Sequence, residues 1–174
     1  MVTPGVEALS SVVSQECLQS GILTAGDIDV TALNSSVRGY AVGSVGAIRA
    51  ALEPLQASWP FDVRQHGYKI QFVPRGGSSV VTIPAADLDA RDAGADPGVQ
   101  ITTSREMDSQ LPKRVTVNYL DADREYNRGT QYAERLTTPS INALTLDLPI
   151  VLTSTEGAGK AEVLLYLYWL ERHD

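Results

Sequence analysis

"RVTVNYLDADREYNRGTQYAER", residues 114–135, contains the pattern that decides the fold. Val115, Val117 and Tyr119 alternate with polar residues, as in a strand that buries one face. Residues 130–136 follow an acidic interval and are the expected return strand. We therefore predict two antiparallel strands, with the alternating apolar side chains in the core. The polar side chains expected to face water or a neighbouring molecule are those of Arg114, Asn118 and Arg128.

The acidic interval between these strands matches part of a calcium-binding loop but fails where the geometry is strictest. Asp121, Asp123 and Glu125 occupy the first, third and fifth positions of such a loop. The sixth position requires glycine and the twelfth a bidentate carboxylate, whereas this chain has Tyr126 and Tyr132 there. We therefore expect a solvated turn without a metal. A catalytic carboxylate pair needs a fixed separation, which the sequence alone does not supply.

The other chemical motifs also predict no active site. "GAGK" at residues 157–160 lacks the surroundings of a phosphate-binding loop, because Ser154 replaces the required glycine and Ala161 the hydroxyl residue. His66 falls in an expected turn and His173 is the penultimate residue, so neither suggests a nucleophile–histidine set. We predict that the chain is not an enzyme and has no catalytic residue, metal or cofactor.

Composition narrows the class of protein. The 174 residues suffice for one domain or two small ones with a real core, and 43% of them are apolar. A net charge of −7 argues against a nucleic-acid partner, which would require a basic face. Cys17 is the only cysteine, so an intramolecular disulfide is impossible. We expect no membrane span and no secretory signal, and folding in a cytoplasm.

Two helices are expected in the first third of the chain. Thr3 and Pro4 have the chemistry of a helix start, and the periodic residues that follow extend to a cap at Gly21. A second helix is expected from near Ser44 to Trp59, with Pro54 either kinking it or beginning a new segment. The apolar residues at helical spacing are Val6, Leu9, Val13 and Cys17 in the first and Ile48, Leu52 and Leu55 in the second.

Extended segments surround these helices. Residues 27–33 and 37–42 are expected to be short strands. "FDVRQHGYKIQFVP", residues 61–74, predicts a hairpin, because Gly67 supplies the positive φ of a tight turn and Tyr68, Ile70 and Phe72 alternate after it. Further strands are expected at "SVVTIP" (79–84), at 99–103 and at "ALTLDL" (143–148), with a break at 87–98.

The last helix, from residues 154–156 to about 172, is apolar almost all round. One stripe is expected to face the chain's own core; it consists of Ala161, Leu164, Leu165 and Tyr168. Val163, Tyr166 and Leu170 are our candidate interaction residues on the remaining surface, which also carries Leu167 and Trp169. Their expected partner is another subunit or more of the same polypeptide. A central core helix is the alternative.

The order of these elements predicts an α+β fold with mainly antiparallel sheet and about three helices. Residues 1–90 would form a helix and β-hairpin subdomain, and residues 91–174 the later antiparallel strands with the C-terminal helix. The two parts could also form one composite domain.

From about residue 37 to 172 the chain resembles the hub region of phage tail-tip proteins. These are the large baseplate or host-specificity proteins of long-tailed phages, prophages and gene transfer agents. The resemblance rests on a helix followed by a hairpin that ends near "FVPRGG" (72–77), on "LPKRVTVNYLDADREY" (111–126), and on "LDLPIVLT" (146–153) before a helix. It lies in the order of structural segments and includes no catalytic motif.

The resemblance implies a structural component of a virion tail, folded first in a host bacterial cytoplasm. Such hubs are trimers that close the tail tube and connect it to receptor-binding parts. The family's proteins are far longer, so this chain is expected to be a piece or a split version of one. Two other readings remain open: a module binding a host-surface glycan or protein through Trp59, Tyr126 or Tyr132, and a cell-wall hydrolase using Asp121 or Glu125.

Overall fold

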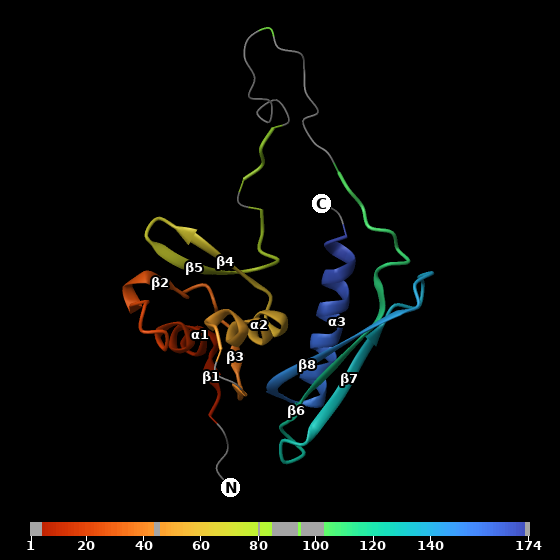
Figure 1. Ribbon diagram of the computed structural model, residues 1–174. Coiled ribbons are helices and arrows are strands. Elements are labelled where there is room, and N and C mark those ends of the chain that lie inside the picture. Colours follow the sequence, from red (N-terminus) through yellow and green to blue (C-terminus); the bar gives the residue numbers. More distant parts are fainter. Residues whose placement is uncertain (1–4, 44–45, 80, 85–93, 95–102, 173–174) are drawn as a thin grey trace.

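The computed structural model describes residues 5–43, 46–79, 81–84, 94 and 103–172. Within them the chain forms three α-helices, a short 3-10 turn and three small sheets, which confirms the α+β class (Figure 1). Most strand pairings are antiparallel, but two are parallel: β2 with β5 and β6 with β8. The alternation of residues in the sequence predicted β4, β5, β6, β7 and β8 but not β1, and it contained no information on these parallel pairings.

The first helix, α1 (Leu9–Leu18), begins later than predicted. The strand β1 (Glu7–Ala8) precedes it and pairs with β3 (Ser36–Val37), so Val6 lies outside the helix and is exposed. Thr3 and Pro4, the predicted start, lie outside the described residues. The predicted inner face is confirmed, because Leu9, Val13 and Cys17 are buried.

The second helix, α2 (Ile48–Ser58), passes through Pro54 without a break. The idea that a new segment begins at this proline is therefore wrong. The start predicted near Ser44 is also wrong, because Ala47 is the N-cap; Ser44 itself lies outside the described residues. Leu52 and Leu55 are buried, as their spacing predicted.

The predicted hairpin is present as β4 (Phe61–His66) and β5 (Lys69–Pro74). Gly67 has a φ of +62°, the left-handed conformation that the turn requires. The buried rings of Phe61 and Phe72 meet edge to face with centroids 5.8 Å apart. Tyr68 lies in the turn and is fully exposed, so its predicted place in the strand is wrong. The short strand β2 (Ile28–Asp29) pairs with β5.

One predicted strand is not formed, and another falls almost entirely outside the described residues. In "SVVTIP", the described residues 79 and 81–84 belong to no strand and are exposed. An extended segment needs a hydrogen-bonding partner to become a strand, and alternation alone does not supply one. Of the predicted strand at 99–103, only Thr103 is described, and it is not in a strand; most of the break at 87–98 also lies outside the described residues.

The central sheet of the second half has the order β7-β6-β8, with β6 (Pro112–Asp121), β7 (Arg128–Glu134) and β8 (Asn142–Leu152). Residues 135–141 cross the start of β6, which places β8 beside β6 and parallel to it. The buried Ser140 donates a hydrogen bond to the Leu111 carbonyl at this crossing. The Asn142 side chain also donates to the Ser109 and Gln110 carbonyls, which further stabilises the crossing.

The helix α3 (Ser154–Leu170) covers one face of this sheet. It begins with a capping box, in which the Thr153 side chain accepts from the Glu156 N–H and Glu156 accepts from the Thr153 N–H. Gly157 lies against Tyr119, and a Cβ there would stand 2.6 Å from Cε1 of that ring. Glycine therefore lets the helix approach the sheet closely.

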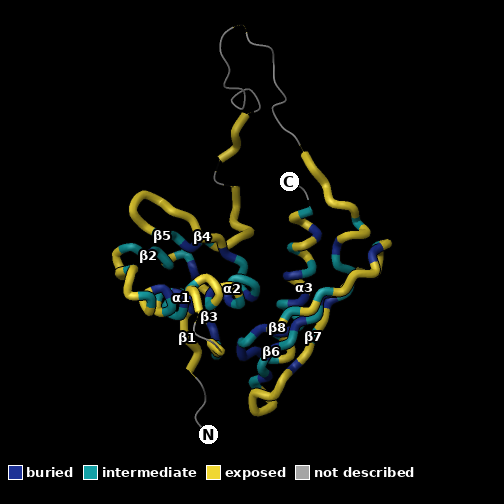
Figure 2. The backbone as a smooth tube through the Cα atoms, in the orientation of Figure 1, coloured by how far each residue is buried: buried dark blue, intermediate teal, exposed yellow. Residues whose placement is uncertain are grey.

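The elements up to β5 and those from β6 onward form two groups that face each other (Figure 1). Their buried side chains nevertheless belong to one hydrophobic core cluster (Figure 2). A bridge between Tyr40 and Ile150 joins the backbone of the groups. The predicted boundary near residue 90 falls in a stretch outside the described residues, so the division into subdomains stays a prediction.

Two glycines of α3 form a matched test of this packing. Gly157→Ala is expected to destabilise the fold by about 1–2 kcal/mol, because overpacking against Tyr119 outweighs the better helix propensity of alanine. At Gly159 a Cβ would meet nothing within 4 Å, so Gly159→Ala should stabilise by about 0.5–1 kcal/mol. Urea unfolding measures both. Equal stabilisation by the two variants would contradict this packing.

Candidate assembly interface

The three candidate residues on α3 lie together on its outer side. Val163, Tyr166 and Leu170 are 46%, 64% and 55% exposed. Their spacing of three and four residues places them on one face of a helix. We call this set the outer stripe. Its exposure follows from the opposite face, where Gly157, Ala161 and Leu164 are buried against the sheet.

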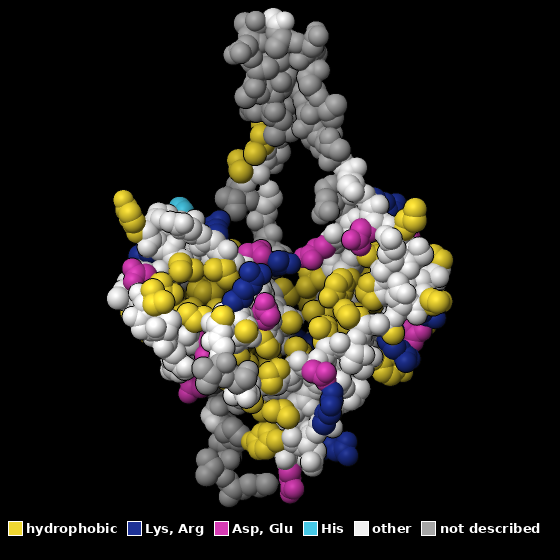
Figure 3. Space-filling view, in the orientation of Figure 1, with side chains coloured by type: hydrophobic (Ala, Val, Ile, Leu, Met, Phe, Trp, Pro, Cys, Tyr) yellow, Lys and Arg dark blue, Asp and Glu magenta, His cyan; other side chains and the backbone are white. Residues whose placement is uncertain are grey.

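The inner stripe was predicted only in part. Ala161 and Leu164 are buried and Leu165 is half-buried, as expected. Tyr168 was also expected there but is 40% exposed. It faces a groove of about 320 Å³ between α3 and α2. Figure 3 shows hydrophobic side chains gathered over these two helices.

A second groove, of about 540 Å³, runs between α3 and β7. Its apolar lining includes Leu136, Leu165, Tyr166 and Trp169. Trp169 is fixed in place, since its indole N–H donates to the Pro112 carbonyl at 3.0 Å. The groove connects the outer stripe to the edge of the sheet, because Tyr166 belongs to both.

Sequence reasoning missed the cations that hold Trp169. The guanidinium carbon of Arg135 lies 4.2 Å from the centre of the indole ring, and that of Arg172 lies 5.8 Å from it. The contact of Arg135 with Trp169 joins residues far apart in the chain, whereas Arg172 lies only three residues from Trp169. The only signal in the sequence was an arginine near the end of a predicted strand, which is too common to be specific.

Charged contacts connect the two groups of elements. Arg38 donates to both carboxylate oxygens of Glu156 at 3.2 Å. Arg75 bridges Asp62 and Glu171, at 2.8 and 2.6 Å. The Lys160 ammonium lies 4.4 Å from the ring centre of Trp59.

The surroundings at this junction lower the pKa values of Glu156 and Lys160. Burial opposes the ionisation of Glu156, but hydrogen bonds from Thr153 and the nearby Arg38 together lower the pKa of its carboxyl. Burial lowers the pKa of Lys160, and the charge of Glu156 partly opposes that effect. The ionised Glu156 therefore stabilises both the start of α3 and its contact with Arg38.

The acidic interval forms the turn of the β6–β7 hairpin, as predicted. The Asp121 N–H donates to the Asn127 carbonyl at 2.9 Å, and Glu125 and Tyr126 have φ values of +54° and +61°. Asp121 itself is only 5% exposed, so describing all of these carboxylates as solvated was wrong. Its carboxylate accepts the Asp123 N–H at 3.0 Å, which closes the turn.

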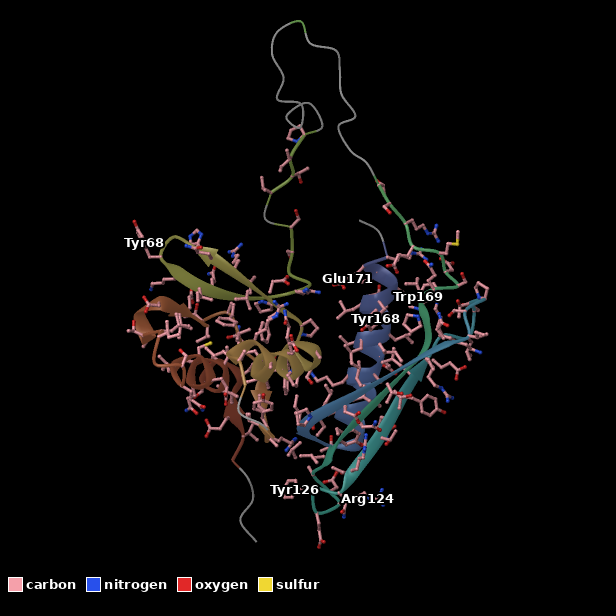
Figure 4. The ribbon with its side chains drawn as sticks, viewed as in Figure 1. Tyr68, Arg124, Tyr126, Tyr168, Trp169 and Glu171 are labelled. Carbon is pink, nitrogen blue, oxygen red and sulfur yellow. The ribbon has the colours of Figure 1, made fainter. Side chains whose placement is uncertain are left out.

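The carboxylates and aromatic residues of the two open readings do not form a common cleft. Tyr126 lies at the turn, at the opposite end of the sheet from Trp169 (Figure 4). Tyr132 is exposed, but one face of its ring is covered by the Arg114 guanidinium at 4.2 Å. Trp59 is half-buried beneath Lys160. Glu125 stands exposed in the same turn as the buried Asp121.

The remaining sequence motifs are placed as follows. Residues 157–160, the "GAGK" motif, lie inside α3 and not in a loop. His66 ends β4, and His173 lies outside the described residues. Within the described ranges, no group of three or more metal-ligating side chains comes together. None of the described helices is both long and apolar enough to span a membrane.

Two comparisons identify relatives of this chain. The family described as "Putative phage tail protein" matches residues 47–174. Among solved structures, a chain of the "Virion of native gene transfer agent (GTA) particle" is similar with a TM-score of 0.83 and 25% sequence identity. The similarity covers 97% of this chain and 37% of that one, so this chain spans less than half the length of its relative. No curated protein matches the chain.

The capping carboxylate yields a pH-dependent prediction. Because the folded pKa of Glu156 is lowered, its contribution is present above the unfolded pKa and is lost as the pH falls through the folded value. Glu156→Gln should cost at most about 1 kcal/mol at pH 7, since glutamine can still accept the Thr153 N–H but loses the charge of the partly exposed ion pair with Arg38.

The difference between Glu156→Gln and wild type should begin to shrink below the ordinary glutamate pKa of about 4.3 and should vanish only below the lowered pKa of the folded state. Denaturant unfolding at several pH values measures it. Glu162→Gln, at an exposed position on the same helix, is the control. A cost for Glu156→Gln that stays constant down to pH 3 would show that ionisation is unimportant here.

The turn yields a prediction about calcium. Because Asp121 is buried and already accepts a backbone N–H, millimolar calcium should leave the melting temperature unchanged. Thermal unfolding with and without calcium measures this. A rise of several degrees that saturates with calcium and disappears in Asp121→Ala would instead establish a metal loop.

Proposed function

Because this chain belongs to a family of phage tail proteins, we propose that it is a structural part of a tail tip or baseplate hub. It acts by assembly, and it helps to connect the tail tube to receptor-binding parts. The similarity to a chain of a gene transfer agent virion supports this role. The observation that carries it is the outer stripe of α3, an apolar surface left uncovered on a helix whose opposite face buries Gly157, Ala161 and Leu164 against the sheet.

The energetics favour covering that stripe. Burying an exposed aliphatic or aromatic side chain contributes about 1.5–3 kcal/mol. Val163, Tyr166 and Leu170 form one continuous row, and the groove beside β7 extends it. Large exposed apolar patches on soluble domains commonly mark protein–protein contacts.

In the proposed assembly, three copies form the hub, and this chain is one part of a longer polypeptide. The 37% coverage of the gene transfer agent chain is consistent with such a part. The partners are other tail-tip subunits or further segments of the same polypeptide. The chain folds in the host bacterial cytoplasm and then functions in the virion tail, without nucleic acid, cofactor or catalysis.

The two other readings receive less support from the geometry. A glycan platform requires open aromatic faces near one another, whereas Trp59 and Tyr132 are covered by cations and Tyr126 lies apart from both. A hydrolase requires an acid facing a cleft, whereas Asp121 is occupied in its turn. We therefore propose no enzymatic role.

The role of the outer stripe is tested with two tyrosines. Tyr166→Glu should weaken self-association at least tenfold, because it places a charge in the apolar row. Tyr68→Glu changes a fully exposed tyrosine at the tip of the β4–β5 hairpin and should have no effect (Figure 4). Light scattering over a range of concentrations measures the mass of each variant and of the wild type.

Covering by further segments of the same polypeptide gives a different result. A version extended beyond Asp174 by its natural continuation would then be monomeric and unfold at a higher temperature. A wild type that is strictly monomeric, with no gain in stability from the extension, would overturn the proposal.

A further inference from the structure

We propose that the free edge of β7 accepts residues 81–83 of a second copy of this chain as an added strand. This deepens the proposed hub function by naming the contact between copies, and it rests on that function only for the number of copies. Three observations support it: the direction of the backbone groups of β7, the lining of the groove beside it, and a segment that alternates like a strand but lacks a sheet.

The backbone groups of β7 show that its outer edge is open. In an antiparallel pair, successive residues direct their N–H and C=O alternately toward and away from the partner strand. The Arg135 N–H donates to the Lys113 carbonyl, and the Asn127 carbonyl accepts the Asp121 N–H. The backbone N–H and C=O groups of the odd-numbered residues therefore point toward β6. The even-numbered residues therefore direct both groups outward; they are Arg128, Thr130, Tyr132 and Glu134. Within the described residues no backbone group pairs with them.

The opposite edge of the same sheet shows how such an edge is covered. On β8, the Pro149 carbonyl accepts the Ala41 N–H, and the Val151 N–H donates to the Gly39 carbonyl, both at 2.9 Å. An extended segment from elsewhere in the chain thus serves as an added strand there. Proteins usually protect long exposed edges with proline, lysine or a bulge. β7 contains no proline or lysine and pairs with β6 in an unbroken register.

The surroundings of this edge specify the pattern of the added strand. On one side is the groove, where Leu165, Tyr166 and Trp169 of α3 form an apolar floor and the charged Glu134, Arg135 and Glu162 also line the walls. On the other side is the polar outer face of the sheet, with exposed Thr130 and Tyr132. Because successive side chains of a strand point to opposite faces, the added strand must alternate apolar and polar residues.

Residues 81–83 have this pattern. Val81 and Ile83 are 72% and 59% exposed and flank the polar Thr82. They belong to no strand, although their sequence predicts one. Placed on β7, Val81 and Ile83 would enter the groove while Thr82 joins the outer face. Pro84 lacks an N–H and would end the added strand. Three residues suffice for pairing in this molecule, where β1, β2 and β3 have two each.

The contact joins the β7 edge of one copy to residues 81–83 of another. Because these two surfaces differ, the contact is heterologous. Such a contact forms a ring if the rotation between copies closes and a filament if it does not. A closed ring of three copies would fit the proposed hub. A contact in which β7 pairs with β7 of the other copy would instead be two-fold symmetric and stop at a dimer.

Complementation distinguishes these arrangements. Thr130→Pro removes an outward N–H and leaves the β6 ladder in place, since proline is tolerated at such edge positions. Ile83→Asp replaces one of the two apolar side chains that would enter the groove with a charged one. Each variant alone should associate at least tenfold more weakly than wild type. Their equimolar mixture should form a dimer, because Ile83→Asp retains a sound edge and Thr130→Pro a sound segment. Analytical ultracentrifugation reads both results.

Disulfide trapping gives a readout that does not depend on Thr130→Pro folding or on tight association. Thr82→Cys and Tyr132→Cys are prepared as separate proteins, mixed and oxidised, so that a cross-link between them must join two copies; Tyr132 is an outward-facing residue of β7 that lines the groove. Thr82→Cys mixed with Thr145→Cys is the control, because Thr145 is exposed on β8 of the same sheet. The wild type, whose Cys17 is buried, is the blank.

We expect the Thr82–Tyr132 pair to cross-link at least tenfold more than the control. Equal cross-linking of the two pairs, or a mixture of the Thr130→Pro and Ile83→Asp variants that stays monomeric when both are folded, would overturn the strand addition. If Tyr166→Glu abolishes association while Thr130→Pro and Ile83→Asp do not, the hub function stands and this contact falls. If the disulfide forms but Tyr166→Glu does not weaken association, the strand addition stands and the proposed role of the outer stripe falls.

Discussion

The position of Tyr119 between two glycines constrains the second half of the molecule. Its ring lies on the buried face of the central strand and is 2% exposed. A Cβ at either Gly129 on β7 or Gly157 on α3 would stand 2.6 Å from the ring. Such a separation is far below an ordinary carbon–carbon contact of about 3.5–4.0 Å. The sheet and the helix can therefore meet at this place only because both partners of the tyrosine lack a side chain.

This close approach determines what the rest of α3 presents. With Gly157 against the sheet, Ala161 and Leu164 follow on the same face and are buried. The outer stripe must then face away, and Trp169 reaches the start of β6 near the helix C-terminus. At the other end, Glu156 caps the helix and contacts Arg38 from the first half of the chain. One packing constraint thus orients both the exposed apolar row and the charged junction.

The sequence predicted the elements that depend on local pattern. Gly67 identified the turn of the β4–β5 hairpin, and the alternation of Val115, Val117 and Tyr119 identified β6 and its buried face. The exposure of the outer stripe could be predicted because α3 has more apolar residues than one face can hold. The parallel pairing of β8 could not, since it depends on a chain crossing at Ser140. Nor could the stacking of Arg135 on Trp169, which joins distant residues.

The wrongly predicted strand at residues 79–84 shows a physical limit of such reasoning. Alternation reports that a segment can bury one face, but a strand also needs backbone partners, and these come from the tertiary or quaternary arrangement. In the described chain, residues 81–83 alternate as a strand does but have no strand beside them. The outer edge of β7 has the opposite deficit: within the described residues, its outward N–H and C=O groups have no backbone partner. In an isolated chain, water can form hydrogen bonds with the backbone groups of residues 81–83 and of the β7 edge. The apolar side chains of residues 81–83 and of the groove beside β7 nevertheless remain exposed. In an assembly, one pairing would satisfy the backbone and bury those side chains together, which links the failed prediction to the proposed contact between copies.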